Sequence, residues 1–511
     1  MVGLSDYTND TGGFGEGFPG SDREITSADL QKAMFAGNGG SGGSTANQGS
    51  VPGSIQPAIT ESLEATLKDL TMRRSELKIW KQVKTSPAYA LSEEFLQMTD
   101  IGADSGGFHD EFDTPEATES TYNRKSERVK YIGTLRQISH QAQLVRSRIG
   151  DVVMKEVENG TTWVMRRLNS ALITANASVV PSEFNGLYAQ HGAYGGNDDI
   201  YKSVQEYYSD QTVIDLRGKS LTQEVFFDAA ETVDDNHGYA NQIFGPNSVI
   251  SDLAKDYIAK QRILLGQSTT NTFGAVPKSI VTPFGDIELQ IDKNLKKGNN
   301  LTGKARLFDA TNVASHSKAP SAPTADGTTP VAAIADTGTK FTDGAGDYFY
   351  GVAAVNKYGI SPMTSLNKAG AKTSISAQQA ADLKFTATAG ANTTTGFIIY
   401  RSKKSPVTNE AQTPMYPIFK VSTTELGAGY DSAGNNTIRD RNRVLPDMEE
   451  SFIWQGDDEV FEFKQLAPLM RMDLARVNTS TQFLILLYGT PQLYQPKKTI
   501  RLINIGEFVA D

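Results

Sequence analysis

The chain has 511 residues, of which 38% are hydrophobic, so it is long enough to form two to four domains with packed cores. Its formal net charge of -10 disfavours a general affinity for nucleic acid, because such binding needs clustered lysine and arginine. The chain has no cysteine, which excludes disulfides, thiolate metal sites and a cysteine nucleophile. It shows neither a signal peptide nor an apolar run of roughly 18 residues, so we expect a soluble protein made in the cytosol.

Residues 1–58 are dominated by Gly, Ser, Asn and Thr and cannot bury enough apolar surface to fold alone. Two interpretations stay open: a disordered tail, or an arm that becomes ordered only against neighbouring subunits. A helical pattern follows at residues 61–82, where Leu63, Leu67, Leu70 and Leu77 recur near helical spacing. Its flanking polar faces indicate a surface helix.

Residues 83–135 are typical of a long hairpin whose arms, at residues 88–95 and 128–138, enclose a tip rich in glycine and acid. Because an isolated two-stranded ribbon is marginal in water, we expect this one to lie on another subunit. The tip acids are Asp110, Glu111, Asp113 and Glu116. A metal or acid pair is one interpretation, but their irregular spacing favours a solvated or subunit-contacting charge run.

Residues 145–175 carry the strongest helical pattern, with one apolar stripe that runs from Val145 to Ala171. A helix of this length would span about 45 Å and act as a spine. Gly160 lies in its interior, where glycine costs about 1 kcal/mol relative to alanine, so we expect a kink or break there.

Residues 180–300 resemble a compact α/β unit. Helical patterns at 221–236 and 251–266 alternate with strand-like runs at 241–250 and 286–292. His191 and His237 fall in separate loops without ligand partners at fixed spacing, so both are interpreted as ordinary polar histidines rather than metal ligands.

A linker-like stretch, SHSKAPSAPTADGTTP, precedes short β runs that continue to about residue 443 and indicate a β-sandwich. This block resembles immunoglobulin-like and fibronectin type III modules. Tyr348, Tyr350, Val352, Ala354, Asn356 and Gly359 look like the YxVxAxNxxG strand of those modules, and residues 398–401 look like the IYR strand. The IYR strand normally comes first, so the resemblance implies a circularly shifted sandwich.

Beyond the sandwich, the stretch QFLILLYGTPQLYQPKKTIRLINIGEFV at residues 482–509 predicts two hydrophobic strands. Phe483 to Tyr488 form an unbroken apolar run, which is typical of a strand buried on both faces. The sandwich is therefore an insertion into a core domain that begins before it and ends after it.

The whole arrangement resembles the major capsid protein of tailed bacteriophages, which has the Hong Kong 97 fold. The similarity is closest to a large myovirus-type branch with an immunoglobulin-like insertion. It depends on the Leu-Tyr-Gly turn at 487–489, the Pro-Lys-Lys run at 496–498 and FNGLY at 184–188. The resemblance implies an α+β fold with an N-terminal arm, an extended loop, a spine helix with a peripheral sheet, and an axial domain, into which an all-β sandwich is inserted.

The resemblance also implies domain boundaries. They are 1–60 for the N-terminal arm, 61–82 for a helix, 83–135 for the extended loop, 136–180 for the spine helix, 181–318 for the axial domain and flanking strands, 319–443 for the immunoglobulin-like insertion, and 444–511 for the return to the core and the final peripheral-sheet strands. We expect the insertion to face outward and to be removable without loss of the shell.

Five residues are candidate inter-subunit contacts: Glu111, Asp113 and Glu116 in the extended loop, and Lys497 and Lys498 at the turn into the last strand. Solvated edge charge is an equally good interpretation of the lysine pair. Lys125 and Lys130 flank the loop, but no paired Asn or catalytic carboxylate is identified, so we expect no isopeptide crosslink. The glycine-rich N-terminus predicts no cleaved scaffold segment and hence a separate scaffolding protein.

The function implied is that of a major capsid protein that assembles into pentamers and hexamers of an icosahedral head around double-stranded DNA. Expected partners are other copies of the chain and scaffolding, portal and decoration proteins. No cofactor, membrane or sequence-specific DNA binding is expected, and the location is the virion after assembly in the host cytoplasm. The alternative is another virion or surface-adhesion protein. An enzyme is disfavoured, because GxSxG, HExxH and P-loop motifs are absent, as is a GxGxxG run that leads into a helix and an acid.

Overall fold

The computed structural model describes most of the chain beyond residue 76. The described residues are 77–102, 108–112, 114, 118–144, 151–191, 212–260, 278–292, 305–308, 313–327, 329–367, 370–390, 392–406, 409–423, 437–475 and 479–507. The chain divides into two compact units, Met1–Asp69 and Leu70–Asp511, and every described residue belongs to the second. The predicted arm at 1–60 and most of the predicted helix at 61–82 lie outside the described residues, and only α2, Lys78–Gln82, is seen of that helix.

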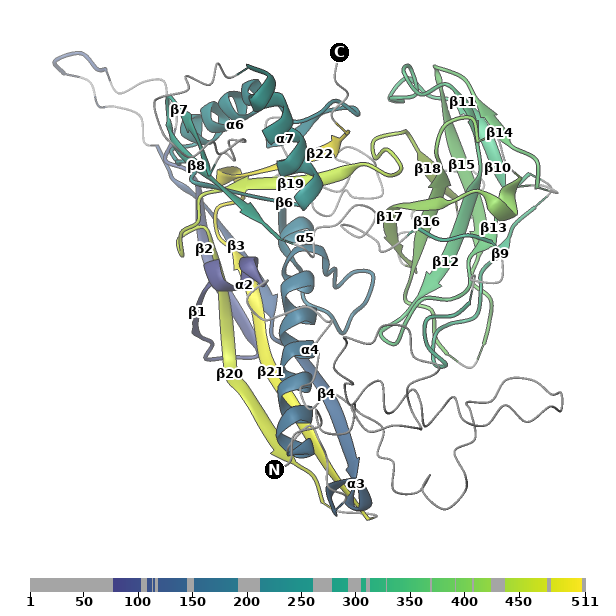
Figure 1. Cartoon of the computed structure of the whole chain (residues 1–511). Coiled ribbons are helices and arrows are strands. Elements are labelled where there is room, and N and C mark those ends of the chain that lie inside the picture. Colours follow the sequence, from purple (N-terminus) through teal and green to yellow (C-terminus); the bar gives the residue numbers. More distant parts are fainter. Residues whose placement is uncertain are drawn as a thin grey trace, which may run out of the picture. The chain divides into compact units, whose positions relative to one another are not determined.

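A four-stranded sheet unites strands from both ends of the described chain (Figure 1). Its order is β1-β20-β21-β4, with bounds Lys84–Pro87, Phe461–Asp473, Ser480–Leu493 and Lys130–Ser139. β1 pairs with β20 in parallel, whereas the other neighbours are antiparallel. β21 therefore lies between a strand of the same C-terminal segment and a strand some 340 positions earlier, with Ser480 opposite Ser139.

The spine helix is α4, Val152–Thr174, which lies along β4 and β21 (Figure 1). Asp151 caps it, because its side chain accepts hydrogen bonds from the backbone N–H groups of Val153 and Met154. Its 23 residues span about 35 Å, and the predicted start at 145 lies outside the described residues. A short helix, α3, His140–Leu144, precedes it.

The prediction of a break at Gly160 is wrong, since the helix continues through this residue. Glycine allows close packing at this position. A Cβ atom at this position would lie 2.6 Å from Cδ1 of Ile485 on β21, so the missing side chain lets helix and sheet approach closely.

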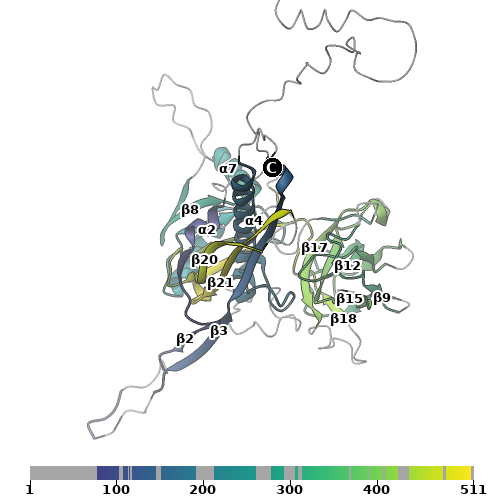
Figure 2. The same ribbon diagram turned by 90° about the horizontal axis from the view of Figure 1, so that it is seen from below.

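The extended loop is a ribbon of β2, Ser92–Asp100, and β3, Thr121–Arg128, which run antiparallel and side by side (Figure 2). The predicted second arm at 128–138 is wrong. Residues from Lys130 onward instead form β4, the edge strand of the four-stranded sheet, where they pair antiparallel with the longer strand β21. We call β2 and β3 the ribbon below.

A second, six-stranded sheet has the order β5-β22-β19-β6-β8-β7. The bounds are Val213–Asp215, Thr499–Ile505, Glu449–Trp454, Gln242–Gly245, Gly285–Ile291 and Ser279–Thr282. Helices α6, Gln223–Asp235, and α7, Asn247–Lys260, contribute buried side chains to the same core. The predicted helix at 221–236 and the predicted strand at 286–292 are confirmed as α6 and β8. The predicted strand at 241–250 is right only as far as Gly245, because α7 begins at Asn247 rather than at 251, and β7 was not predicted.

The last strand was assigned to the wrong sheet. The boundary 444–511 predicts final strands that close the peripheral sheet, but only β21 does so. β22 pairs with β19 and β5 of the six-stranded sheet. The burial prediction for residues 483–488 is also wrong: Phe483, Ile485 and Leu487 are buried, whereas the residues between them are half-buried. One face therefore packs on the spine helix and the other does not.

The described part of residues 319–443, which we call the inserted β region, contains two antiparallel sheets and a short pair. One sheet has the order β10-β15-β18 with β9 beside β15, the other has the order β13-β12-β16-β17, and β11 pairs with β14. The bounds from β9 to β18 are Thr324–Ala325, Val331–Ala335, Gly346–Tyr348, Tyr350–Val355, Thr364–Ser365, Thr373–Ile375, Gln379–Thr386, Gly396–Ser402, Met415–Ser422 and Thr437–Asp440. The immunoglobulin-like assignment stays a prediction.

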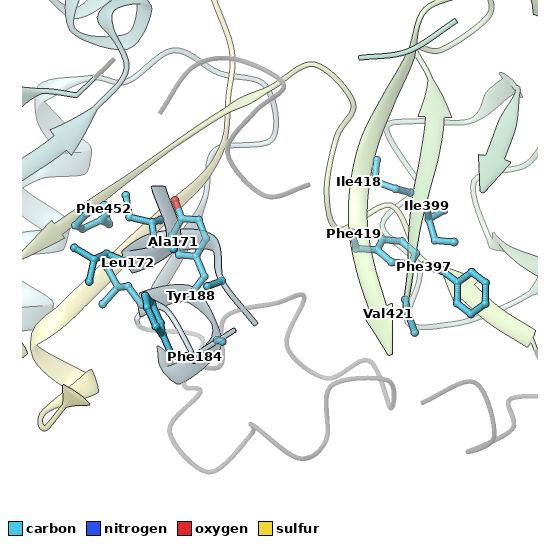
Figure 3. Close-up of a cluster of buried hydrophobic side chains, with 14 of the residues drawn as sticks. Ala171, Leu172, Phe184, Tyr188, Phe397, Ile399, Ile418, Phe419, Val421 and Phe452 are labelled. Atoms are coloured by element: carbon cyan, nitrogen blue, oxygen red, sulfur yellow. The ribbon is translucent and has the colours of Figure 1, made fainter. Parts of the chain in front are cut away.

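Two groups of buried side chains are drawn in Figure 3. Phe184 and Tyr188 lie near Leu172 of the spine helix, and Phe397, Ile399 and their neighbours come from β16 and β17. An ion pair is also buried in the β region: Arg401 of β16 donates to Asp440 of β18 at 2.5 Å. Burial alone would disfavour the Arg401 cation, but the adjacent carboxylate raises the pKa of this guanidinium above its usual range.

Among the described residues, no helix is both long and apolar enough to span a membrane.

Candidate assembly surfaces

The four-stranded sheet has an apolar face that no other part of the described chain covers completely. Side chains alternate along β4 and β21, so Ile132, Ile138, Phe483 and Ile485 share the side of the spine helix. The opposite side carries the following residues, which we call the sheet face: Tyr131, Leu135, Met470, Met472, Leu484, Leu486 and Tyr488.

Register brings these side chains into rows across three strands. Met472 lies opposite Leu484, which in turn lies opposite Leu135. Tyr488 lies opposite Tyr131, and their rings pack edge to face at 4.8 Å. Leu135 and Tyr131 are 53% and 59% exposed, which is unusual for large apolar side chains in adjacent rows.

Gly133 makes the middle row flat. A Cβ atom there would lie 2.4 Å from Cδ2 of Leu486 and 2.9 Å from the carbonyl oxygen of Ile485. The absence of a side chain therefore lets Leu486 lie over the β4 backbone. The sheet face is a continuous apolar surface rather than a set of isolated side chains.

The ribbon also has two unlike faces. On the inner face, Phe95 packs edge to face on Tyr494 at 4.9 Å, and the Gln97 amide donates to the Tyr494 carbonyl at 2.6 Å. On the outer face, Leu96, Met98 and Tyr122 are exposed, and Leu96 is 71% exposed. Met98 lies directly opposite Tyr122, so these two side chains form a cross-strand apolar pair that faces solvent.

The base of the ribbon is tied to the segment that follows the spine helix. Both carboxylate oxygens of Glu127 accept hydrogen bonds from the Asn185 amide, at 3.2 and 3.3 Å. Lys130 donates to the Pro181 carbonyl at 2.5 Å. Burial raises the pKa of Glu127 to about 7, although Asn185 and Lys130 both lower it. Glu93 lies opposite on β2, where its Oε1 accepts from the Tyr89 and Ala90 backbone N–H groups at 2.7 Å.

The predicted contact residues are dispersed. Glu111 lies exposed in the ribbon's tip, whereas Asp113 and Glu116 lie outside the described residues. Lys497 is exposed in the 3-10 turn η7, Pro496–Lys498, and Lys498 is half-buried against Gly238. Within the part of the chain that the structure describes, Glu111 and Lys497 have no ion-pair partner. Their role as inter-subunit contacts stays a prediction.

His191 differs from its predicted setting. It ends a short helix, α5, Leu187–His191, and is buried, with its Nε2 donating to the Thr499 carbonyl at 2.8 Å. Burial lowers its pKa to about 4, so the ring is uncharged at neutral pH. It therefore joins α5 to the first residue of β22 as a neutral donor.

Sequence reasoning missed the apolar character of both faces. The sequence VKYIGTLRQI contains a signal, because large apolar residues fall on both faces of the strand. Tyr131 and Leu135 lie on one face, and Ile132 and Ile138 lie on the other. Such a pattern indicates a strand covered on two sides. Within the described chain, Tyr131 and Leu135 on the second side are left exposed.

The fold and these surfaces define the class of the protein. A ribbon, a long helix backed by a four-stranded sheet, and a six-stranded sheet with helices follow in the order that the resemblance to the Hong Kong 97 fold implies. The ribbon and the four-stranded sheet both also carry exposed apolar side chains. The sequence model of the SU10 major capsid protein family matches residues 84–341, half of the chain. The chain belongs to this family.

Two relatives carry names that agree with that membership. The major capsid proteins of Staphylococcus phage S25-3 and Staphylococcus phage K are each 22% identical over 461 residues, which cover 87% of this chain and 89% of each relative. A capsid structure of a native GTA particle has a TM-score of 0.44 and 8% identity, and covers 90% of this chain and 98% of that one. The capsid of Cyanophage P-SCSP1u has a TM-score of 0.43 and 8% identity, with 89% and 95% covered.

The protein is thus a phage major capsid protein, and the alternative of a surface-adhesion protein is not favoured. The family is one of structural proteins rather than enzymes.

Proposed function

We propose that the chain builds an icosahedral head of hexamers and pentamers around double-stranded DNA, with the ribbon's outer face of one subunit packed on the sheet face of the next. The observation that supports this is that exposed apolar side chains gather on two surfaces of one chain, the ribbon's outer face and the sheet face. A contact between unlike patches is heterologous, and it closes into rings when the rotation between copies permits.

The energetics favour burial of both faces at an interface. Each large apolar side chain removed from water contributes roughly 1.5–3 kcal/mol. A single ribbon contact of this kind is weak after the entropy of association is deducted, but every subunit of a closed shell makes it twice, once with each face. The acids and lysines predicted as contacts, including Glu111, Lys497 and Lys498, would set register at the rim of such an interface.

The proposed partners are other copies of the chain, a separate scaffolding protein, a portal and decoration proteins. Assembly would take place in the host cytoplasm. The negative net charge is consistent with a container that leaves DNA mobile, because a strongly cationic lining would bind the phosphate backbone.

The test is assembly of a ribbon variant. Leu96→Glu with Met98→Glu places two charges on the ribbon's outer face without touching the inner face that packs on Tyr494. The variant should remain folded and fail to form shells by negative-stain microscopy, with the scaffolding protein present in parallel samples. Ser126→Glu, on the same exposed face, is the matched control and should assemble. Shells from the double variant at wild-type yield would reject the proposed contact.

A further inference from the structure

Two exposed clusters on this chain are complementary in charge and in aromatic content. The tip cluster is Phe108, Asp110, Glu111 and Phe112, all exposed at the end of the ribbon. The Tyr358 patch is His316, Lys318, Lys357 and Tyr358, all exposed. Lys357 and Tyr358 lie in the inserted β region, and His316 and Lys318 lie in the segment just before it.

The Tyr358 patch gathers positive charge on one ring. The ammonium groups of Lys318 and Lys357 lie 5.5 and 5.0 Å from the centre of the Tyr358 ring, and the His316 ring stacks on it at 6.0 Å with an interplanar angle of 18°. Each ammonium is attracted by the ring face, but the two repel each other. Across the described ranges, neither lysine has a carboxylate within ion-pair distance. A bound anion would relieve that repulsion.

Hydrogen bonds hold the patch in place before anything binds. Asn356 Oδ1 accepts from the Tyr358 and Gly359 backbone N–H groups at 2.9 and 3.0 Å, while Asn356 Nδ2 donates to the Lys318 carbonyl at 3.0 Å. Ser315 Oγ accepts from the Ile360 N–H at 2.7 Å. Two loops some 40 residues apart are thereby joined, so little conformational entropy is lost when a ligand binds.

The tip cluster carries charge of the opposite sign. Asp110 and Glu111 have no cationic partner among the residues that the structure describes, and the flanking Phe108 and Phe112 are fully exposed. Exposed phenyl rings beside carboxylates fit a surface that offers both cations and an aromatic face. A nucleic acid bound to the Tyr358 patch would pair with its lysines, but it would not explain why two phenyl rings are exposed in the tip cluster.

We propose that the tip cluster of one subunit docks on the Tyr358 patch of a second copy. This inference rests on the proposed function, because it makes the ribbon contact two regions of its neighbour: the sheet face with its outer apolar side chains and the Tyr358 patch with its tip. The inserted β region then takes part in assembly rather than standing apart from it.

Charge exchange tests the contact. Lys318→Glu with Lys357→Glu should lower shell yield about tenfold, and Asp110→Lys with Glu111→Lys should do the same, because each places like charges together at a repeated contact. The four changes combined should restore the yield. Lys404→Glu, an exposed lysine elsewhere in the β region, is the control and should have no effect. Pair variants that assemble normally, or a combined variant with no recovery, would overturn the docking.

A disulfide test can be interpreted directly, because the chain has no cysteine of its own that could form other disulfides. Glu111→Cys with Lys357→Cys should give a ladder of linked chains from assembled shells on a non-reducing gel. Glu111→Cys with Lys404→Cys should not. Intact shells without a ladder, or a disulfide formed within single chains, would overturn docking on a second copy and leave the proposed function unaffected. If the wild-type chain forms no shells, that result counts against the proposed function itself.

A DNA titration tests whether the Tyr358 patch binds DNA instead of a second copy of the chain. A fluorescent double-stranded oligonucleotide should bind the wild-type subunit no better than the Lys318→Glu, Lys357→Glu variant. Binding that is lost in this variant, together with no rescue in the charge exchange, would assign the patch to DNA and overturn the proposal.

Discussion

Glu127 lies half-buried at the base of the ribbon, and its protonation affects stability. Its pKa rises from 4.5 to about 7 on folding, mainly because burial disfavours the charged carboxylate. The folded state therefore binds this proton more tightly than the unfolded state. The stabilisation is fully present below the unfolded pKa and is lost as pH rises through the folded pKa.

Glu127→Gln should remove this dependence. The amide keeps an oxygen that accepts from Asn185 but carries no charge, so at about pH 8 the variant should be more stable by on the order of 1–2 kcal/mol, and at about pH 5 the difference should shrink. Thermal unfolding of the full-length subunit at both pH values measures it. Glu119→Gln, at an exposed position, is the control. An equal difference at both pH values would contradict the assignment.

Gly160 shows a second effect at a single position. Gly160→Leu should destabilise the subunit by about 1–3 kcal/mol, because the added side chain occupies the place of Ile485 Cδ1. Adding Ile485→Ala should recover part of the loss. Asn159→Leu, on the exposed side of the same helix, should change the midpoint of chemical denaturation little. A Gly160→Leu variant as stable as wild type would show that the sheet adapts freely.

At the scale of elements, helices and strands inside one segment were predictable, and their partners were not. The 221–236 pattern gave α6 because its apolar spacing is local. The assignment of residues 128–138 to the ribbon was wrong because strand pairing depends on a partner far along the chain. The candidate contact Glu111 could be read from charge. The sheet face could not, since it requires knowing which side of β21 meets the spine helix.

Neighbouring residues of β21 should therefore respond differently to the same change. Phe483→Asp buries a charge beside the spine helix and should prevent folding, whereas Leu484→Asp lies on the sheet face and should leave the fold intact while abolishing shells. Circular dichroism reports the first outcome and electron microscopy the second. If both variants fold, or if the Leu484 variant assembles, the two-faced description of this strand is wrong.

At the scale of the molecule, the inserted β region is joined to the core by more than its two connections. Val179 and Val180, just beyond the spine helix, share a buried cluster with Phe349 and Ile398 of the β region. Arg217 also donates to the carbonyls of Asn442 and Lys340, each at 2.7 Å. These contacts argue against the expectation that the inserted β region can be removed without loss of the shell.

Replacing residues 320–443 by a short Gly-Ser linker should yield an aggregation-prone subunit, because Val179 and Val180 lose their cover. The same deletion with Val179→Ser and Val180→Ser should be soluble. Size-exclusion chromatography distinguishes the two. A simple deletion that is monodisperse and forms shells of unchanged diameter would show that the region is a dispensable decoration.

The pairing of Ser480 with Ser139 also has a consequence for timing. β4 emerges from the ribosome early, and its partner β21 follows only after roughly 340 further residues, which at about 5–20 residues per second takes some tens of seconds. β22 completes the other sheet later still. Until then, a nascent chain has a spine helix and a ribbon but no finished surface on which a neighbour's ribbon could dock. On the proposed contact between the ribbon and the sheet face, a chain can accept a neighbour's ribbon only after its C-terminal strands have been synthesised.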